Sequence, residues 1–346
     1  MAARAVARRS LAVAAALAAL ASCSAPSPAT APRAERTSAT RSAGPAHSPA
    51  IKTALGRLGR FRTRRASLTV IEPAHTGPAG DRLGARRLFI QIWRPLTRSG
   101  RSAGAAAGSL PLIAFGPGFM QCGGPYSDLL RAWASAGYVV AAVNFPRSDC
   151  RTGAAATESD LVNQPADISY AITALLRRSA QGRLGERLAR TEIGIAGQSD
   201  GGDTVAAVAA NTCCTDRRVR AAAVLSGAEW PAMPGAFFAH QHAAMLFTQG
   251  SADTVNLPGC SARMYRADPA HDRFYLNLLG ADHTGPYWGA NRYERIVARV
   301  TLAFFDRYVL GQRAAARAMR SAGNAGNAAR LFSHGGGDLP RGACLT

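Results

Sequence analysis

Apolar and polar positions follow a regular pattern along this 346-residue chain from residue 67 onward. Short, nearly unbroken apolar runs alternate with stretches in which apolar residues recur at helical spacing. Such runs are typical of strands that a sheet buries on both faces, and the alternation with helices is typical of a mostly parallel sheet. From residue 110 onward the runs are "LPLIAFGPG", "GYVVAAVNFP", "TEIGIAGQS", "VRAAAVLSG", "AAMLFTQGS" and "RFYLNLLGA".

Two earlier runs, "SLTVIE" at 67–72 and "RRLFIQIWRP" at 86–95, predict an antiparallel pair that opens the sheet. The helical stretches between and after the strands cover residues 126–137, 166–180, 202–211 and 293–311. Since 47% of the residues are hydrophobic, the chain can bury a large core. We therefore expect an α/β fold, with one domain of about eight mostly parallel strands and helices on both faces.

The N-terminal residues predict export. Arginines precede the apolar run 11–20, which is too short to span a bilayer permanently, so residues 1–22 are expected to be a signal peptide. The sequence "LASC" resembles the lipobox of bacterial lipoproteins, which implies that Cys23 is acylated and becomes the mature N-terminus. Ordinary cleavage that leaves Cys23 unmodified is the alternative. The expected location is the extracytoplasmic face of the cell membrane, where the lipid is the anchor.

Composition divides the remainder of the chain into three parts. Residues 23–50 are rich in Ser, Pro and Ala without an apolar period, which is typical of a flexible tether. Residues 51–311 contain all the predicted strands and helices and are expected to form the folded domain. Residues 312–346 are small, polar and Gly-rich, and we expect a surface tail.

The chain is strongly basic, with a formal net charge of +20, and Lys52 is its only lysine. A charge of this size attracts polyanions, but the sequence contains no zinc-finger spacing, RNA-binding signature or basic helix. We therefore expect a solvated basic surface and no nucleic-acid partner. Neither a metal site nor a cofactor is expected, because the histidines are scattered and no dinucleotide-binding fingerprint follows the first strand.

Six cysteines remain once Cys23 is set aside, and an exported protein with six cysteines is expected to form disulfides. They are Cys122, Cys150, Cys213, Cys214, Cys260 and Cys344. Cys122 and Cys150 both follow strands at one edge of the predicted sheet, which favours a bridge between them. Cys213 and Cys214 are adjacent, so we expect each to bond elsewhere, to Cys260 or Cys344.

One five-residue pattern points to chemistry. Gly197-Gln198-Ser199-Asp200-Gly201 follows an apolar strand and precedes a helix, which is the context of a nucleophile elbow. Glycine suits both ends of such a tight turn, because a Cβ there would crowd the adjoining strand and helix. The pattern predicts that Ser199 is a nucleophile, and the alternative is a plain glycine-rich turn.

Three further motifs lie at strand ends in the same chain: "GPGFM" at 116–120, "GSAD" at 250–253 and "ADH" at 281–283. With these four motifs in this order, residues 67–311 resemble the α/β-hydrolase superfamily, particularly bacterial esterases similar to dienelactone hydrolases, platelet-activating-factor acetylhydrolases and cutinase-like polyester hydrolases. The resemblance implies a serine hydrolase that cleaves carboxylic esters, whether of lipids, small molecules or polyesters.

A serine nucleophile requires a histidine base that a carboxylate orients, and this superfamily has the chain order serine, acid, histidine. That order implies Asp253 as the acid and His283 as the base, since each follows one of the last two predicted strands. The neighbouring Asp282 is too close in sequence to orient the imidazole, and we expect it to cap the loop. The resemblance also implies an oxyanion hole formed by the backbone N–H groups of Asp200 and Phe119.

Two assignments near the expected site have open alternatives. Met120 competes with Phe119 as the second oxyanion donor, and "GPG" can simply end the strand. Trp230 is expected at the rim as a substrate-binding residue, by similarity to lipid and polyester esterases, and packing is its alternative role. The same motifs also fit a cell-envelope acyltransferase or a catalytically silent binding lipoprotein.

Overall fold

The structure is a computed structural model, and it describes residues 58–97, 99–103, 108–239, 241–335 and 338–344. These residues belong to one compact unit, Ala46–Thr346. The predicted signal peptide, the predicted acylation site Cys23 and the predicted tether lie outside the described residues. In the described part, none of the helices combines the length and the apolar composition that crossing a bilayer requires.

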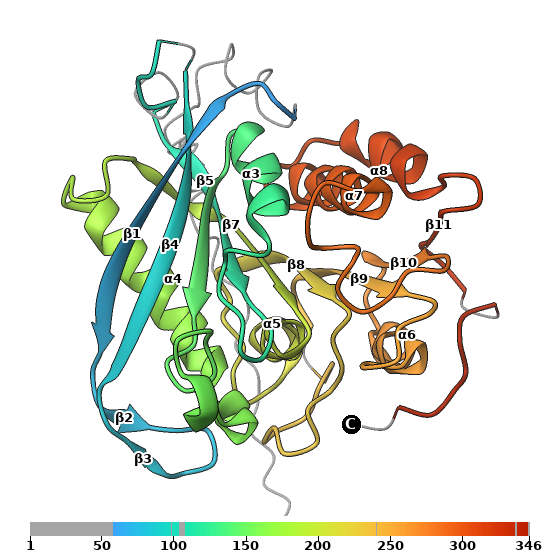
Figure 1. The fold of residues 1–346 in the computed structure, drawn as a ribbon, viewed down its shortest axis with the longest axis horizontal. Helices are drawn as coiled ribbons and strands as arrows, with labels where there is room; N and C mark the ends of the chain where they lie inside the picture. Colours follow the sequence, from blue (N-terminus) through green and yellow to red (C-terminus); the bar gives the residue numbers. More distant parts are fainter. Residues whose placement is uncertain (1–57, 98, 104–107, 240, 336–337, 345–346) are drawn as a thin grey trace, which may run out of the picture. The chain divides into compact units, whose positions relative to one another are not determined.

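A mixed sheet of nine strands forms the centre of the fold (Figure 1). The strands, in their order across the sheet, are β1 (Arg62–Glu72), β4 (Arg86–Leu96), β6 (Val139–Asn144), β5 (Leu110–Gly116), β7 (Leu188–Gln198), β8 (Val219–Leu225), β9 (Ala244–Gly250), β10 (Arg273–Leu278) and β11 (Ala329–Phe332). Two short strands of two residues each, β2 (His75–Thr76) and β3 (Arg82–Leu83), pair with each other in a separate sheet. The α/β fold class is the predicted one, with one more strand than the eight expected.

The middle of the sheet is parallel and its edges are antiparallel. Strands β6, β5, β7, β8, β9 and β10 run parallel to one another. The first two strands form the predicted antiparallel pair, in which Arg62 opposes Leu96 and Glu72 opposes Arg86. Every residue of β5, β6 and β9 is buried, which explains why these strands read as unbroken apolar runs in the sequence.

Helices cover both faces of the sheet. They are α3 (Ser127–Ser135), α4 (Gln164–Ala180), α5 (Asp200–Ala210), α6 (Pro258–Ala267), α7 (Arg292–Tyr308) and α8 (Ala315–Gly323), with two short 3₁₀ helices, η1 (Gly153–Ala155) and η2 (Glu158–Asn163). One core cluster joins the sheet to α4, α5 and α6 through residues such as Ile168, Val205 and Met264. A second joins it to α3 and α7 through residues such as Leu129 and Phe304.

The segment from residue 312, which we expected to be a surface tail, is part of the fold. Helix α8 packs beside α7, and β11 pairs with β10 as an antiparallel edge strand. Cys344 closes this segment onto α6 through a disulfide with Cys260. The expectation was wrong because the order of this segment comes from tertiary contacts with β10 and α6, which its small and polar composition does not reveal.

One disulfide prediction is confirmed and the other is wrong. The Cys122–Cys150 bridge is confirmed. The expectation that Cys213 and Cys214 bond to Cys260 and Cys344 is wrong, because Cys213 pairs with its neighbour Cys214. The pairing follows from distance: the Cα atoms of Cys260 and Cys344 lie 4.6 Å apart, which is within the range that a disulfide spans.

Candidate active site

The predicted site residues lie on loops that follow neighbouring strands. Ser199 follows β7, Asp253 follows β9 and His283 follows β10. Because these strands are parallel, their carboxyl ends meet at one edge of the sheet, where the loops of α/β folds commonly form binding sites. The sheet therefore brings together three side chains that are 84 residues apart at most.

Ser199 lies in a strained turn between β7 and α5. Its φ of 56° and ψ of −128° are outside the regions that non-glycine residues favour. A Cβ at Gly197 would lie 2.0 Å from the carbonyl oxygen of Gly201, and a Cβ at Gly201 would lie 1.9 Å from that of Gly116. These two glycines therefore allow the close packing of strand and helix that holds Ser199 in its strained conformation.

Ser199, His283 and Asp253 form a continuous hydrogen-bonded chain. The Oγ of Ser199 lies 3.0 Å from Nε2 of His283, and Nδ1 of His283 lies 2.8 Å from Oδ2 of Asp253. Since a carboxylate accepts, Nδ1 is the ring nitrogen that donates, which leaves the lone pair of Nε2 to accept from the serine hydroxyl. The geometry suits proton transfer from Ser199 to His283.

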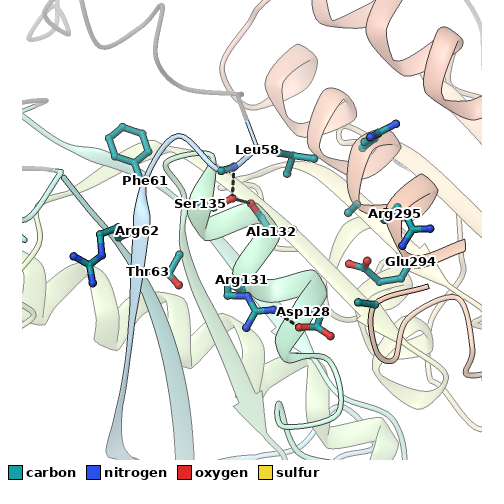
Figure 2. A pocket seen from close by; sticks show the side chains of 14 residues that line it. Leu58, Phe61, Arg62, Thr63, Asp128, Arg131, Ala132, Ser135, Glu294 and Arg295 are labelled. Carbon is teal, nitrogen blue, oxygen red and sulfur yellow. Dashed lines mark hydrogen bonds and ion pairs between the residues drawn. The ribbon is translucent and has the colours of Figure 1, made fainter. Parts of the chain in front are cut away.

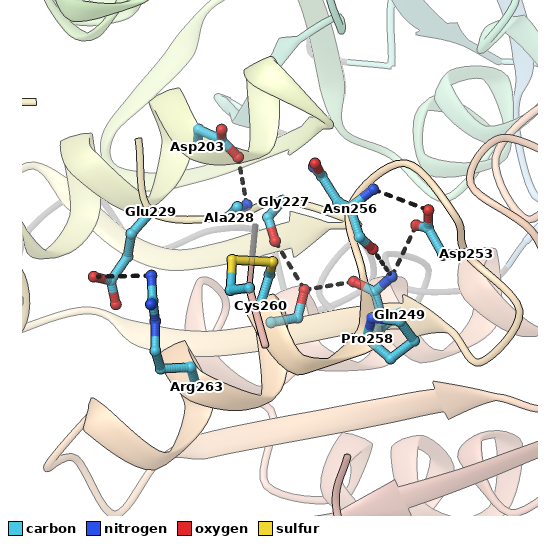
Figure 3. The surroundings of a disulfide bond; sticks show 12 residues. Asp203, Gly227, Ala228, Glu229, Gln249, Asp253, Asn256, Pro258, Cys260 and Arg263 are labelled. Atoms are coloured by element: carbon cyan, nitrogen blue, oxygen red, sulfur yellow. Dashed lines mark hydrogen bonds and ion pairs between the residues drawn. A yellow bond between two sulfur atoms is a disulfide. The ribbon is translucent and has the colours of Figure 1, made fainter. Parts of the chain in front are cut away.

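Asp253 is held rigidly in place. It is 2% exposed, and its Oδ1 accepts from the backbone amides of Val255 and Asn256 at 2.9 and 3.1 Å. Its Oδ2 also accepts from the side-chain amide of Gln249 at 2.8 Å (Figure 3). The side-chain oxygen of Gln249 in turn accepts from Ser261 on α6, beside the Cys260–Cys344 disulfide. With both oxygens occupied by donors, the carboxylate has one orientation toward His283.

The loop after β5 supplies the predicted oxyanion donors. A Cβ at Gly118 would lie 3.1 Å from Cβ of Ser199, so this loop passes directly against the nucleophile. The amide of Met120 donates to the carbonyl of Ser148 at 2.7 Å, whereas the amide of Phe119 forms no hydrogen bond with any described residue. Asp200 is the first residue of α5, where a backbone N–H has no acceptor within the helix. The amides of Phe119 and Asp200 are therefore available, and that of Met120 is not.

Two residues that the sequence analysis did not single out connect the loops of the site. The hydroxyl of Tyr126 accepts from the amide of Gly118 at 3.2 Å and donates to Oε1 of Gln198 at 2.7 Å. The side-chain nitrogen of Gln198 donates to the carbonyl oxygen of His283 at 3.2 Å and lies 3.2 Å from its Nε2. Gln198 occupies the variable second position of the elbow pattern, which gave no signal of this role.

A second polar chain supports the oxyanion loop from the other side. Thr204 on α5 donates to the side-chain oxygen of Gln164 at 2.6 Å, and the side-chain nitrogen of Gln164 donates to Oγ of Ser148 at 3.0 Å. Ser148 is the residue whose carbonyl oxygen accepts from the amide of Met120. All three side chains are buried, so they join α5, α4 and the oxyanion loop into one rigid unit.

Two tryptophans, Trp230 and Trp288, pack in different surroundings. Trp230 packs with Leu161 and Met233 in a small cluster that also contacts Cys214, and its indole nitrogen is buried without a partner among the described residues. A substrate-binding role for Trp230 stays a prediction. Trp288, which the sequence analysis passed over, stacks edge-on against Tyr126 with ring centroids 6.0 Å apart. Trp288 therefore packs against the tyrosine whose hydroxyl links the loops of the site.

Asp200 and Asp282 have distinct environments. The pKa of Asp200 is raised to about 7, first by burial and then by the charge of Glu158, while the charge of His283 opposes the rise. Its Oδ2 has no hydrogen-bond partner among the described residues. Asp282 accepts from the amides of Thr284 and Gly285, which confirms its expected loop-capping role.

Comparison with models of known protein families finds no match, and no curated protein sequence is significantly similar to the chain. The chemistry of the site therefore has to be argued from its own geometry. Among the described residues, no group of three His, Cys, Asp or Glu side chains is arranged to hold a metal ion.

Proposed function

We propose that this protein is an exported serine hydrolase that cleaves carboxylic esters through an acyl-enzyme on Ser199. The observation that carries the proposal is the chain from Ser199 through His283 to Asp253, built on a strained elbow between a strand and a helix. Packing alone does not require a serine in that backbone conformation, which costs of order 1 to 3 kcal/mol. The strain is useful for function because it presents Oγ to the histidine.

Acylation follows from this geometry. The Oγ of Ser199 forms a bond to the ester carbonyl carbon while Nε2 of His283 takes the hydroxyl proton. The backbone N–H groups of Asp200 and Phe119 donate to the resulting oxyanion, and one such donor accounts for about 3 to 4 kcal/mol of transition-state stabilisation. The bond to the leaving alkoxide then breaks, and the imidazolium returns its proton to that oxygen.

Deacylation repeats these steps with water as the nucleophile. His283 accepts a proton from water as the water oxygen bonds to the acyl carbon. The bond from that carbon to Oγ of Ser199 then breaks, the carboxylic acid leaves, and the imidazolium returns the proton to Oγ. Asp253 stabilises the imidazolium, because its Oδ2 accepts from Nδ1 of His283 while its Oδ1 is held by the amide of Val255. The fold supports this assignment, because parallel strands bring the three loops to one edge of the sheet.

The oxidising environment that the proposal requires agrees with the three disulfides of the described domain. We further propose that Cys23 carries the lipid that anchors the domain outside the cytoplasm, as the sequence "LASC" indicates.

A fluorophosphonate probe tests the proposal. The purified protein is labelled, digested and mapped by mass spectrometry, and its turnover of nitrophenyl esters of increasing acyl length is measured. A label on Ser199 with turnover that is absent in Ser199→Ala and His283→Ala is the expected result. A folded protein that neither takes the label nor turns over any ester would contradict the proposal and favour a binding lipoprotein instead.

A further inference from the structure

A second feature of the domain lies outside the proposed active site. A groove of about 510 Å³ runs between the start of β1, helix α3 and helix α7 (Figure 2). Its charged lining residues are Arg62, Asp128, Arg131, Glu294, Arg295 and Arg299. Arginines outnumber acids four to two, and they come from three elements that are distant in sequence.

The two acids of the groove balance only half of this positive charge. Arg131 forms an ion pair with Asp128 on the same helix. The other three arginines are exposed, and none forms a hydrogen bond or a close ion pair with a described residue; they are Arg62, Arg295 and Arg299. Exposed guanidinium groups without protein partners are suited to bind phosphate, because each offers two parallel N–H donors.

Apolar side chains line the same groove. Leu58 is 40% exposed, and Phe61 beside it is half-buried (Figure 2). An exposed leucine is unfavourable in water. Apolar side chains next to arginines are typical of surfaces that lie at the boundary between lipid headgroups and acyl chains. This combination favours a lipid over a wholly polar polyanion such as a nucleic acid.

The N-terminal end of the described domain is fixed at the groove. The amide of Gly59 donates to Oγ of Ser135 at 2.8 Å, and the amide of Phe61 donates to the carbonyl oxygen of Ser135, also at 2.8 Å. Residue 58 therefore lies against the end of α3, and the chain that precedes it continues from this rim. A membrane anchor at Cys23, as proposed above, would hold the domain near the bilayer at a high effective concentration.

We propose that the arginine groove binds the phosphates of anionic phospholipids and docks the domain on the membrane surface. The phosphate groups contact Arg62, Arg295 and Arg299, while Leu58 enters the headgroup layer. This inference concerns an interaction surface and does not depend on Ser199 chemistry. One arginine near an anionic bilayer increases the binding of a protein to the membrane about fivefold, so three arginines increase it about a hundredfold.

The test measures binding of the full chain to vesicles, with Cys23→Ser in every protein so that no acyl group contributes. Vesicles of equal parts phosphatidylglycerol and phosphatidylcholine are compared with vesicles of phosphatidylcholine alone in a sedimentation assay. The groove variant combines Arg62→Gln, Arg295→Gln and Arg299→Gln. The control variant removes the same charge at exposed arginines that do not line the groove: Arg177→Gln, Arg183→Gln and Arg190→Gln.

We expect the parent and control proteins to bind the anionic vesicles and the groove variant to bind about a hundredfold more weakly. Equal losses in the two variants would show that only overall charge matters and would overturn the proposal, as would equal binding to both kinds of vesicle. Two further arms use inorganic phosphate and single-stranded DNA. Groove-dependent binding of either one without vesicle binding would assign the groove to a soluble anion. Unchanged turnover of a soluble ester and an unchanged melting temperature confirm that the groove variant is folded.

Discussion

Tyr126 and Gln198 are 72 residues apart in sequence, yet the hydroxyl of Tyr126 donates to the side-chain oxygen of Gln198 across 2.7 Å. That contact orients the amide of Gln198 so that its nitrogen faces His283. The same hydroxyl accepts from the amide of Gly118, beside the proposed oxyanion donor. One buried phenol thus sets the positions of the oxyanion loop, the elbow and the histidine loop relative to one another.

Removal of this hydroxyl should reduce catalysis more than stability. We expect Tyr126→Phe to lower kcat of ester hydrolysis about tenfold with little change in KM, because a net hydrogen bond of about 1 to 1.5 kcal/mol is lost where it positions the reacting groups. Tyr138→Phe is the matched control, since Tyr138 is equally buried and donates to Asp306 instead. Equal kcat in the two variants, at equal melting temperature, would leave Tyr126 with a purely structural role.

The sequence predicts the elements of the fold that depend on local pattern. The buried strands are predictable because strands covered on both faces are mostly apolar, as in β5, β6 and β9. Ser199, Asp253 and His283 were found because each lies directly after such a strand. The structure brings them within hydrogen-bond distance, and their chemistry stays a prediction.

The features that the sequence did not predict depend on contacts between distant segments. The edge strand Ala329–Phe332 is four residues long and exists because β10 offers it an unpaired edge. Tyr126 and Gln198 meet only once the residue before α3 lies against the end of β7. No sequence periodicity distinguishes a tyrosine that only packs from one that also donates a hydrogen bond to a neighbouring loop. This role is therefore visible only in the folded structure.

The surroundings of Asp253 predict the effect of replacing it with asparagine. Its Oδ1 accepts from two backbone amides, so the oxygen of an asparagine would occupy that position and its NH₂ would take the place of Oδ2. That NH₂ would donate to Nδ1 of His283, which moves the ring proton to Nε2 and removes the acceptor for Ser199. We expect Asp253→Asn to keep the fold and lose about 10⁴ in kcat. Measured turnover within tenfold of the parent protein would contradict the assignment of Asp253 as the orienting acid.

Stability should depend on pH through Asp200. Burial raises the pKa of this carboxyl in the folded state to about 7, against an ordinary value of 3.8. The folded protein therefore holds a proton that the unfolded chain has released between these values, and stability falls as the pH rises through this window. Asp200→Asn removes this loss, which is at most about 4 kcal/mol.

The pH dependence is measured as the melting temperature of the parent and of Asp200→Asn at about pH 5 and about pH 8. Burial also raises the pKa values of Asp268 and Asp306, to about 6 and about 7, and these carboxyls contribute the same loss in both proteins. The melting temperature of the variant should therefore rise relative to that of the parent protein as the pH rises. A difference in melting temperature that does not change with pH would argue against the raised pKa of Asp200.

The two long-range disulfides should differ in their effect on activity. Cys122–Cys150 closes a loop of 28 residues that begins just after the oxyanion loop, and the strand-like pairing of Gln121 with Asp149 lies beside it. Cys260–Cys344 closes a loop of 84 residues and joins α6 to the C-terminal segment. Loop-closure entropy predicts losses of about 3 to 4 and about 4 to 5 kcal/mol of stability when the respective cysteine pairs are replaced by alanine. Stability alone therefore predicts the larger effect for Cys260 and Cys344.

Activity at a temperature where both double variants are folded should have the opposite order. Without Cys122–Cys150, the segment that holds the amide of Met120 against Ser148 loses its covalent support, so the neighbouring amide of Phe119 is less well oriented toward the oxyanion. We expect kcat to fall more in the Cys122→Ala, Cys150→Ala protein, although the other double variant melts at the lower temperature. If kcat instead follows the melting temperature, the Cys122–Cys150 bridge contributes only to stability, and the orientation of Phe119 depends on the buried Ser148–Gln164–Thr204 chain alone.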